Sequence, residues 1–244
     1  MLPISSILKI PLDEGVRSVN YSIQGGQLPV VICELNAGEE MFTGSGGMSW
    51  MSSNMQMQTN MEGGLFKGIG RAFAGESMFI ATYTAQGGPG MIAFSSCFPG
   101  SIVAYNLMPG ESLICQKRAF LAAQRSVTLE AAFPNRFSTG MFGGEGFIMQ
   151  RITGPGLVFV EIDGAAIEYD LAAGQTINVD TGHVAMMQQS VQMDITSIKG
   201  FKNVLFGGEG LFLTTLTGPG HIWLQSMTVR NLAQAVIPYI PTKS

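Results

Sequence analysis

The sequence has little charge. Asp, Glu, Lys and Arg make up 12% of its 244 residues, whereas about 25% is usual in soluble domains. The formal net charge is −4, so the chain lacks a generally basic face, and we expect no DNA partner. With so few charges and a positive mean hydropathy, the chain must cover much of its surface, and we expect a homo-oligomer.

Long apolar runs are also missing. Gly, Ser, Thr and Gln interrupt each apolar stretch before it reaches the roughly 20 residues of a membrane-spanning helix. The N-terminus lacks the basic start and apolar core of a secretory signal. Cysteine is scarce too, with an odd set at Cys33, Cys97 and Cys115 that shows no paired spacing. These features favour a reduced, cytoplasmic setting in which the cysteines are small core side chains.

Motifs for catalysis are absent as well. The two histidines, His183 and His221, have no Cys or Asp at ligand spacing, so we expect no metal site built on them. No motif supplies a nucleophile or an orienting carboxylate for either histidine. Cys115 is followed by Lys117 and Arg118, which would lower a thiol pKa, but its repeat counterpart is Val179, which indicates a buried strand. We therefore expect neither an enzyme nor a cofactor.

Methionine is abundant, with 16 residues. Several of them crowd around Trp50, namely Met48, Met51, Met55, Met57 and Met61. Thioethers are ligands for copper(I), but some of these spacings fit a helix and others a strand, so no single geometry collects them. Adaptable packing in a core or at an interface is the interpretation that we favour.

Glycine is also abundant and marks a repeat. The pentapeptide Phe-Gly-Gly-Glu-Gly occurs twice, 64 residues apart (206 − 142 = 64), and each copy leads through an apolar stretch to a Gly-Pro-Gly turn. A looser copy, Phe-Ala-Gly-Glu-Ser, precedes a third Gly-Pro-Gly turn. The copies occupy residues 73–77, 142–146 and 206–210, and the turns occupy residues 88–90, 154–156 and 218–220. Such self-similarity is typical of a repeat architecture.

The local periodicity is that of β-strands. Polar and apolar residues alternate at 126–130, 175–180 and 191–196, which predicts half-buried strands and an all-β fold. We expect an N-terminal arm over residues 1–17 and a single domain over 18–244. That domain would hold three repeats, at about 18–95, 96–161 and 162–227, and a short C-terminal helix over 228–236, capped by Thr228 and ended by Pro238.

Several spaced motifs resemble one known family. They are Glu-Gly-Gly-Leu-Phe-Lys at 62–67, Gly-Glu-Ser at 75–77, Phe-Pro-Gly at 98–100, Ile-Cys-Gln-Lys at 114–117 and both Phe-Gly-Gly-Glu-Gly copies. In this order they resemble the bacterial branch of the mitochondrial-biogenesis family named for altered inheritance of mitochondria. The resemblance implies a fold like the tryptophan RNA-binding attenuation protein. In that fold, short double-stranded β-helix units would pack around a pseudo-threefold axis. It supplies no catalytic residues.

One candidate site consists of the carboxylates that the repeats place in equivalent turns, Glu76, Glu145 and Glu209. A ring of three carboxylates near the pseudo-axis would suit Ca²⁺ or Mg²⁺, which prefer oxygen ligands. The alternative is structural, because glycines on both sides favour a turn in which each carboxylate accepts local backbone N–H bonds. The structural interpretation is the one we favour.

A second candidate site consists of basic residues near these turns. They are Lys67, Arg71, Arg136, Lys199 and Lys202. Together with exposed glycine amides they would bind a phosphate or an anionic headgroup. The alternative is that isolated basic side chains on a charge-poor surface only keep the protein soluble.

Three classes of function stay open. The first is an uncharacterised, non-enzymatic β scaffold or adaptor, peripheral to a membrane complex, with a protein or an anionic membrane surface as its partner; the family resemblance points to this class. The second is a small-ligand, anion or RNA binding module, by analogy with the attenuation protein. Its only aromatic and basic cluster is Phe66 and Phe73 beside Lys67 and Arg71. The third, an unrecognised enzyme, would need a deep polar pocket.

Overall fold

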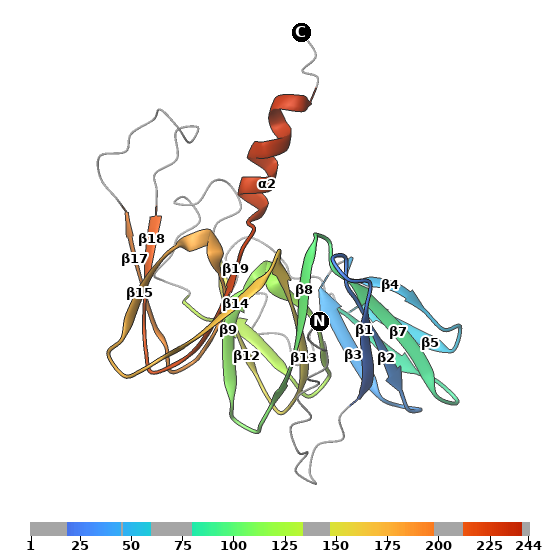
Figure 1. Ribbon diagram of the computed structural model, residues 1–244. Helices are drawn as coiled ribbons and strands as arrows, with labels where there is room; N and C mark the ends of the chain where they lie inside the picture. The colour runs from blue at the N-terminus through green and yellow to red at the C-terminus, as the bar shows by residue number, and fades with distance from the viewer. Residues whose placement is uncertain (1–18, 45, 60–79, 134–146, 198–211, 241–244) are drawn as a thin grey trace, which may run out of the picture.

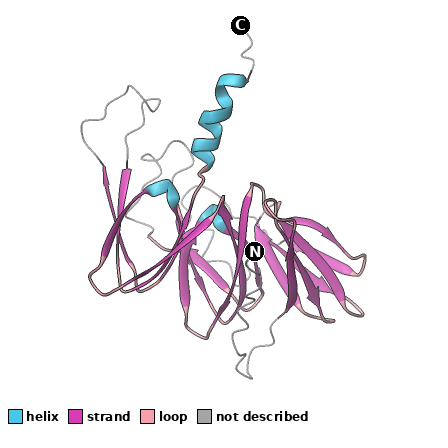
Figure 2. Ribbon diagram, in the orientation of Figure 1, coloured by secondary structure: helices cyan, strands magenta, loops and turns pink. Residues whose placement is uncertain are grey.

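The protein is almost entirely β-sheet. The computed structural model describes residues 19–44, 46–59, 80–133, 147–197 and 212–240. Within these ranges the strands form four antiparallel sheets, and one α-helix follows them near the C-terminus (Figures 1 and 2). The predicted all-β class is confirmed. The predicted arm over residues 1–17 lies outside the described residues.

Within the described residues, each of the three predicted repeats holds six strands. The first repeat holds β2 (Val30–Leu35), β3 (Glu40–Gly44), β4 (Met48–Met51), β5 (Met55–Thr59), β6 (Ile80–Ala85) and β7 (Gly90–Ser95), preceded by β1 (Asn20–Gln24). The second holds β8 (Gly100–Leu107), β9 (Ser112–Gln116), β10 (Phe120–Gln124), β11 (Thr128–Ala131), β12 (Met149–Thr153) and β13 (Gly156–Asp163). The third holds β14 (Ala166–Leu171), β15 (Thr176–Asp180), β16 (Val184–Gln188), β17 (Gln192–Ser197), β18 (Phe212–Thr217) and β19 (Gly220–Gln225).

Strand pairing follows one scheme in every repeat. The sixth strand pairs with the first and the third, and the fifth strand pairs with the second and the fourth. The short helices η1 (Lys117–Ala119) and η2 (Thr181–His183) also occupy equivalent places. β13 ends at Asp163, and the predicted repeat bounds stay predictions. A rotation of about 120° between successive repeats stays a prediction.

Neighbouring repeats share both sheets and core. β10 of the second repeat pairs with β3 of the first, and β16 of the third pairs with β9 of the second. Across the first of these junctions, the buried rings of Phe42 and Phe120 stack with centroids 5.5 Å apart. Across the second, Tyr105 meets Trp223 edge to face at 5.9 Å. Because no repeat covers its apolar faces alone, the sheets become dry only when repeats pack against one another.

The C-terminal helix forms where the sequence predicts it. α2 spans Val229–Val236, and the Thr228 hydroxyl accepts a hydrogen bond from the backbone N–H of Asn231 at 3.1 Å, which caps its first turn. A 3₁₀ turn, η3 (Ile237–Tyr239), follows, with Pro238 inside it. Figure 1 shows α2 projecting away from the sheets. No helix in the described ranges is long and apolar enough to cross a membrane.

Candidate functional site at the junction of the first two repeats

The residues that the sequence singled out as sites belong to segments outside the described ranges. The turn carboxylates Glu76, Glu145 and Glu209 lie outside the described residues. So do the basic candidates Lys67, Arg71, Arg136, Lys199 and Lys202, and the aromatic pair Phe66 and Phe73. The carboxylate ring, the anion site and the RNA-stacking cluster therefore stay predictions.

A different cluster of ionisable side chains lies where the chain passes from β7 to β8. Glu161, near the end of β13, accepts hydrogen bonds from the Ser96 hydroxyl at 2.9 Å and from the backbone N–H of Cys97 at 3.2 Å. The Ser96 hydroxyl also lies 2.9 Å from the Phe98 carbonyl oxygen. Phe98 lies in the same linker, residues 96–99 between β7 and β8. The guanidinium of Arg118, in η1, lies 5.6 Å from the centre of the Phe98 ring, within the range of a cation–π interaction.

Burial sets the protonation of this cluster. Partial burial raises the pKa of Glu161, and the hydrogen bonds from Ser96 and Cys97 offset part of that rise because they favour the charged form. Burial also raises the pKa of Asp163, which ends the same strand, while the positive charge of Arg118 acts in the opposite direction. Two half-buried carboxyl groups therefore share one cation, and both retain protons more readily than free carboxyls do.

The thiol of Cys97 is solvent-exposed but not activated. Burial of its sulfur raises the thiol pKa, and the negative charge of Glu161 raises it further, against a smaller lowering by Arg118. Because the thiolate is the reactive form, this environment slows nucleophilic chemistry rather than promoting it. The arrangement resembles an anchored linker more than a catalytic dyad.

In the third repeat, the residue equivalent to Glu161 is also a hydrogen-bond acceptor, but it is uncharged. Gln225 stands 64 residues after Glu161 (225 − 161 = 64). Its Oε1 accepts a hydrogen bond from the backbone N–H of Asp163 at 3.3 Å, and its Nε2 donates to the Gly182 carbonyl at 2.7 Å. A neutral amide thus fastens the end of β13, just before the second linker, whereas the Glu161 carboxylate fastens the first linker itself. The shared feature is an oxygen acceptor for backbone donors at or next to a linker, which indicates a structural role for Glu161.

A second polar cluster surrounds His221 on the sheet surface formed by β14 and β19. Its Nδ1 lies 2.6 Å from Asp170 Oδ1, and its Nε2 lies 3.0 Å from Glu168 Oε2. The imidazole also packs against the Trp223 ring, with centroids 4.2 Å apart. Both ring nitrogens face carboxylates, so the ring is held in place, and within the described residues neither nitrogen contacts a hydroxyl or thiol side chain.

Sequence reasoning missed both clusters. Asp170 and His221 are directly opposite each other in the β14–β19 pairing but 51 residues apart in the chain. Only the repeat offset gives a signal, because it aligns the strands that carry them. Among the residues that the structure describes, no group of three His, Cys, Asp or Glu side chains is placed to hold a metal ion.

The fold and these clusters together define an all-β protein in which polar side chains of the described residues fasten linkers and strands. The chain belongs to the mitochondrial biogenesis AIM24 family, whose model matches residues 21–227. It is 31% identical over 226 residues to the uncharacterized protein M6_Spy0233 of Streptococcus pyogenes serotype M6, covering 89% of each chain. The crystal structure of protein SPYM3_0169 from Streptococcus pyogenes is similar, with a TM-score of 0.73 and 28% identity, over 91% of this chain and all of that one.

Proposed function

We propose that this protein is a non-enzymatic, cytoplasmic β scaffold, and that its C-terminal helix docks into an apolar groove on a protein partner. The observation that carries the proposal is the surface of α2 and η3. No residue of either helix is buried. The exposed fractions of the large apolar side chains there are 46% for Val236, 60% for Ile237 and 85% for Tyr239, and Ile240, directly after η3, is 56% exposed.

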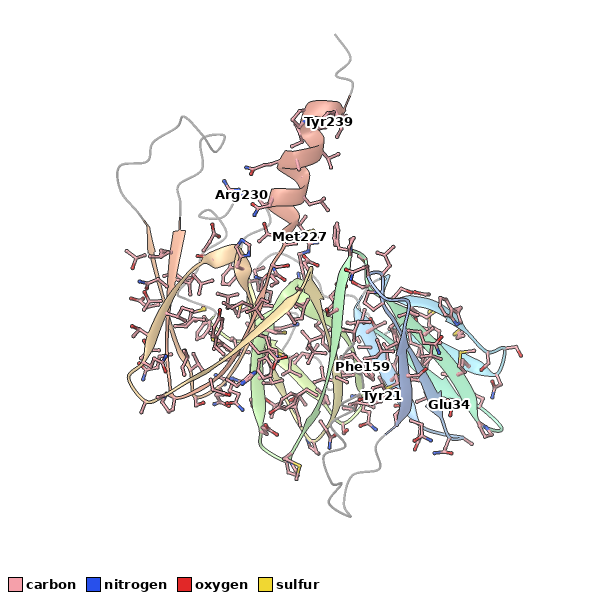
Figure 3. The ribbon with its side chains drawn as sticks, in the orientation of Figure 1. Tyr21, Glu34, Phe159, Met227, Arg230 and Tyr239 are labelled. Carbon is pink, nitrogen blue, oxygen red and sulfur yellow. The ribbon has the colours of Figure 1, made fainter. Side chains whose placement is uncertain are left out.

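The apolar residues of α2 share one face. Val229, Leu232, Ala233 and Val236 follow the three- and four-residue spacing of an amphipathic helix. Only Val229 and Leu232, in the first turns, are half-buried against the body, and the rest of the stripe extends into solvent. Figure 3 shows Tyr239 far out on this projection, beyond Arg230. An apolar stripe presented on a projecting helix fits the helix-in-groove mode of protein recognition.

A protein groove suits this helix better than a lipid surface does. Arg230 is the only charged residue of α2 and η3, and the whole chain carries a net charge of −4. Each basic residue near an anionic bilayer contributes only about 1 kcal/mol, so one arginine gives little attraction. The partner would therefore be a protein with an apolar groove, and the family resemblance would place it at the periphery of a membrane complex.

Site-specific photo-crosslinking in the source organism tests the proposal. A photoreactive amino acid at Val236, on the apolar face, is expected to give a discrete crosslinked band with another protein. The matched control places the same amino acid at Gln234, on the opposite face and also exposed, and gives no such band. Leu232→Ser in the Val236 variant is expected to abolish the band.

Three results would overturn the docking proposal. They are crosslinks only to lipid, crosslinks only to a second copy of the chain, and equal labelling from both helix faces. Flotation with liposomes of neutral and anionic lipid separates the first result from the others, because a lipid-bound helix would carry the protein to the top of the gradient.

A further inference from the structure

The junction between repeats is built the same way twice. In each case the third strand of one repeat pairs antiparallel with the second strand of the repeat before it. Ala122 and Ala123 of β10 lie opposite Thr43 and Phe42 of β3. Met186 and Met187 of β16 lie opposite Cys115 and Ile114 of β9. Both junctions use the same register, as the shared strand pairing within the repeats shows.

Two strands have the same place in their repeats but no such partner. β15 is the second strand of the last repeat, and β4 is the third strand of the first repeat. Among the described strands, β15 pairs only with β18, and β4 pairs only with β7, so each forms the edge of its sheet. Figure 1 shows the two at opposite ends of the molecule. A junction pairs a third strand with a second strand. β4 is a third strand without such a partner, and β15 is a second strand without one, so each edge could supply the partner that the other lacks.

β4 already has the shape that the junction requires. Its pairing with the sixth strand is interrupted by a bulge between Met48 and Trp50. The same bulge interrupts β10 between Phe120 and Ala122, and β16 between Val184 and Met186. These bulges are a shared feature of the third strands, and in β10 and β16 they accompany pairing to the preceding repeat.

Exposure shows what β4 and β15 leave uncovered. Ala122 and Met186 are fully buried, whereas Trp50, which occupies the equivalent position of β4, is 46% exposed. In the second strands, Phe42 and Ile114 are 0% and 2% exposed, whereas their counterpart in β15 is the exposed Asn178. A large indole at an open edge, where its equivalents are dry, indicates a surface that is covered in an assembly.

Two of the devices that protect edges from pairing, charge and proline, are nearly absent from both strands, and the bulge of β4 also occurs in β10 and β16, which do pair across a junction. Natural sheets blunt exposed edges with charged side chains or proline. β4 reads Met-Ser-Trp-Met, and β15 reads Thr-Ile-Asn-Val-Asp, with its single charge at the last residue, Asp180. The outer strands β5, β11 and β17 are edges in all three repeats. β4 and β15 are therefore the strands that lack the inter-repeat partner of their counterparts; β2 differs from β8 and β14 in the opposite sense, because β1 also pairs with it.

We propose that copies of this chain associate head to tail, with β4 of one copy pairing antiparallel with β15 of the next. The register follows from the two internal junctions: Trp50 lies opposite Val179, Met51 opposite Asn178, and Ser52 opposite Ile177. Each interface is heterologous, so the assembly closes into a ring if the rotation allows and otherwise extends as a filament. This inference does not depend on the docking of α2.

Disulfide trapping between two chains that each carry one introduced cysteine, beside the buried Cys33 and Cys115, tests the pairing. One chain carries Asn178→Cys and the other Met51→Cys, each with Cys97→Ser to remove the exposed native thiol. Under mild oxidation the mixture is expected to give a covalent heterodimer. The matched control replaces Met51→Cys by Met57→Cys, an exposed position on the β5 edge, and is expected to give none.

The double variant Met51→Cys/Asn178→Cys in one chain separates self-closure from assembly. Ladders of linked chains support the proposal. A monomer with an internal disulfide would overturn it, because the two edges would then meet within one chain. The absence of any heterodimer in the mixture would also overturn it and would mean that another segment or molecule occupies β4.

Light scattering gives a second, independent readout. Trp50→Lys is expected to raise the concentration at which half of the chains are associated by about tenfold or more, which corresponds to about 1.4 kcal/mol. Met57→Lys is the control, because Met57 is 50% exposed, close to the 46% of Trp50, but lies away from the junction. Equal masses for the unsubstituted protein and Trp50→Lys at every concentration would contradict the proposal.

Discussion

The Glu161 carboxylate accepts a hydrogen bond from the Ser96 hydroxyl at 2.9 Å, although the two residues are 65 positions apart in the chain. The contact fastens the linker between the first two repeats to the last strand of the second. The equivalent side chain in the third repeat, Gln225, is a neutral amide that accepts a hydrogen bond from the backbone N–H of Asp163 at the end of β13, just before the next linker. The comparison predicts that charge at position 161 is dispensable, whereas the acceptor is not.

Glu161→Ala is therefore expected to destabilise the protein and Glu161→Gln to preserve it. Alanine leaves the Ser96 hydroxyl and the Cys97 N–H without their acceptor, at a cost of about 1–3 kcal/mol. Glutamine keeps an oxygen at the same position. Chemical denaturation at neutral pH measures both changes. Equal losses for the two variants would show that the carboxylate charge, and not the acceptor, stabilises the linker.

The pH dependence of stability gives a second test at Glu161. Burial raises its pKa in the folded protein, so the folded state holds the proton more tightly than the unfolded chain does. The group's contribution to the free energy of unfolding is then greatest below the unfolded pKa of about 4.3 and falls as the pH rises through the folded pKa. Asp163 acts in the same direction.

Subtracting the Glu161→Gln profile isolates this group. The stability of the unsubstituted protein relative to Glu161→Gln is expected to decrease as the pH rises from about 4 towards neutrality. Thermal or denaturant unfolding at several pH values measures the difference. A difference that grows with pH would mean that Arg118 and the hydrogen bonds outweigh burial.

The backbone around Gly100, at the end of the same linker, leaves no room for a side chain. A Cβ at this position would lie 2.0 Å from the Ile162 carbonyl oxygen and 3.1 Å from the Gly164 nitrogen, both of them backbone atoms. Neither atom can move aside as a flexible side chain would, so Gly100→Ala is expected to cost about 3 kcal/mol in the free energy of unfolding. Urea denaturation curves measure the loss.

Gly88→Ala is the matched control. A Cβ at Gly88 would meet no atom within 4 Å, so the substitution is expected to change stability by no more than about 0.5 kcal/mol. A similar loss in both variants would indicate a general cost of replacing glycine in these turns rather than a steric clash at Gly100.

Much of the fold could be predicted from the sequence because strands and repeats leave local signals. The alternation at 175–180 predicts β15, and the 64-residue offset links β9 to β15 and β10 to β16. The offset also identifies Cys115 with Val179, and the predicted burial of this position is confirmed, since the two are 0% and 8% exposed. Alternation and repeated motifs can both be read directly along the chain, without knowledge of which strands pair.

The polar clusters around Glu161 and His221 could not be predicted in the same way. The contacts of Glu161 with Ser96, and of His221 with Asp170, join residues 65 and 51 positions apart. They exist only because antiparallel pairing and the crossing between repeats bring distant strands together. The open edges at β4 and β15 were also hidden, because a strand's sequence does not state how many neighbours it has.

Thiol labelling tests the burial of the three cysteines and the electrostatics of the junction together. Cys33 and Cys115 are fully buried, and burial raises the pKa of each thiol to about 12. Only Cys97 is exposed. In the native protein a maleimide is therefore expected to label Cys97 alone, and Cys97→Ser should leave the native chain unlabelled while all remaining thiols react after unfolding.

The rate at Cys97 should also respond to its neighbour. The negative charge of Glu161 contributes to the raised pKa of this thiol, so Glu161→Gln is expected to lower that pKa and speed labelling at a fixed pH near neutrality. Glu130→Gln, which removes an exposed carboxylate whose charge does not act on Cys97, is the control for a general change in protein charge. Unchanged rates in both variants would show that burial alone sets the reactivity of Cys97, and rapid native labelling of Cys33 or Cys115 would contradict the packing of the first and second repeats.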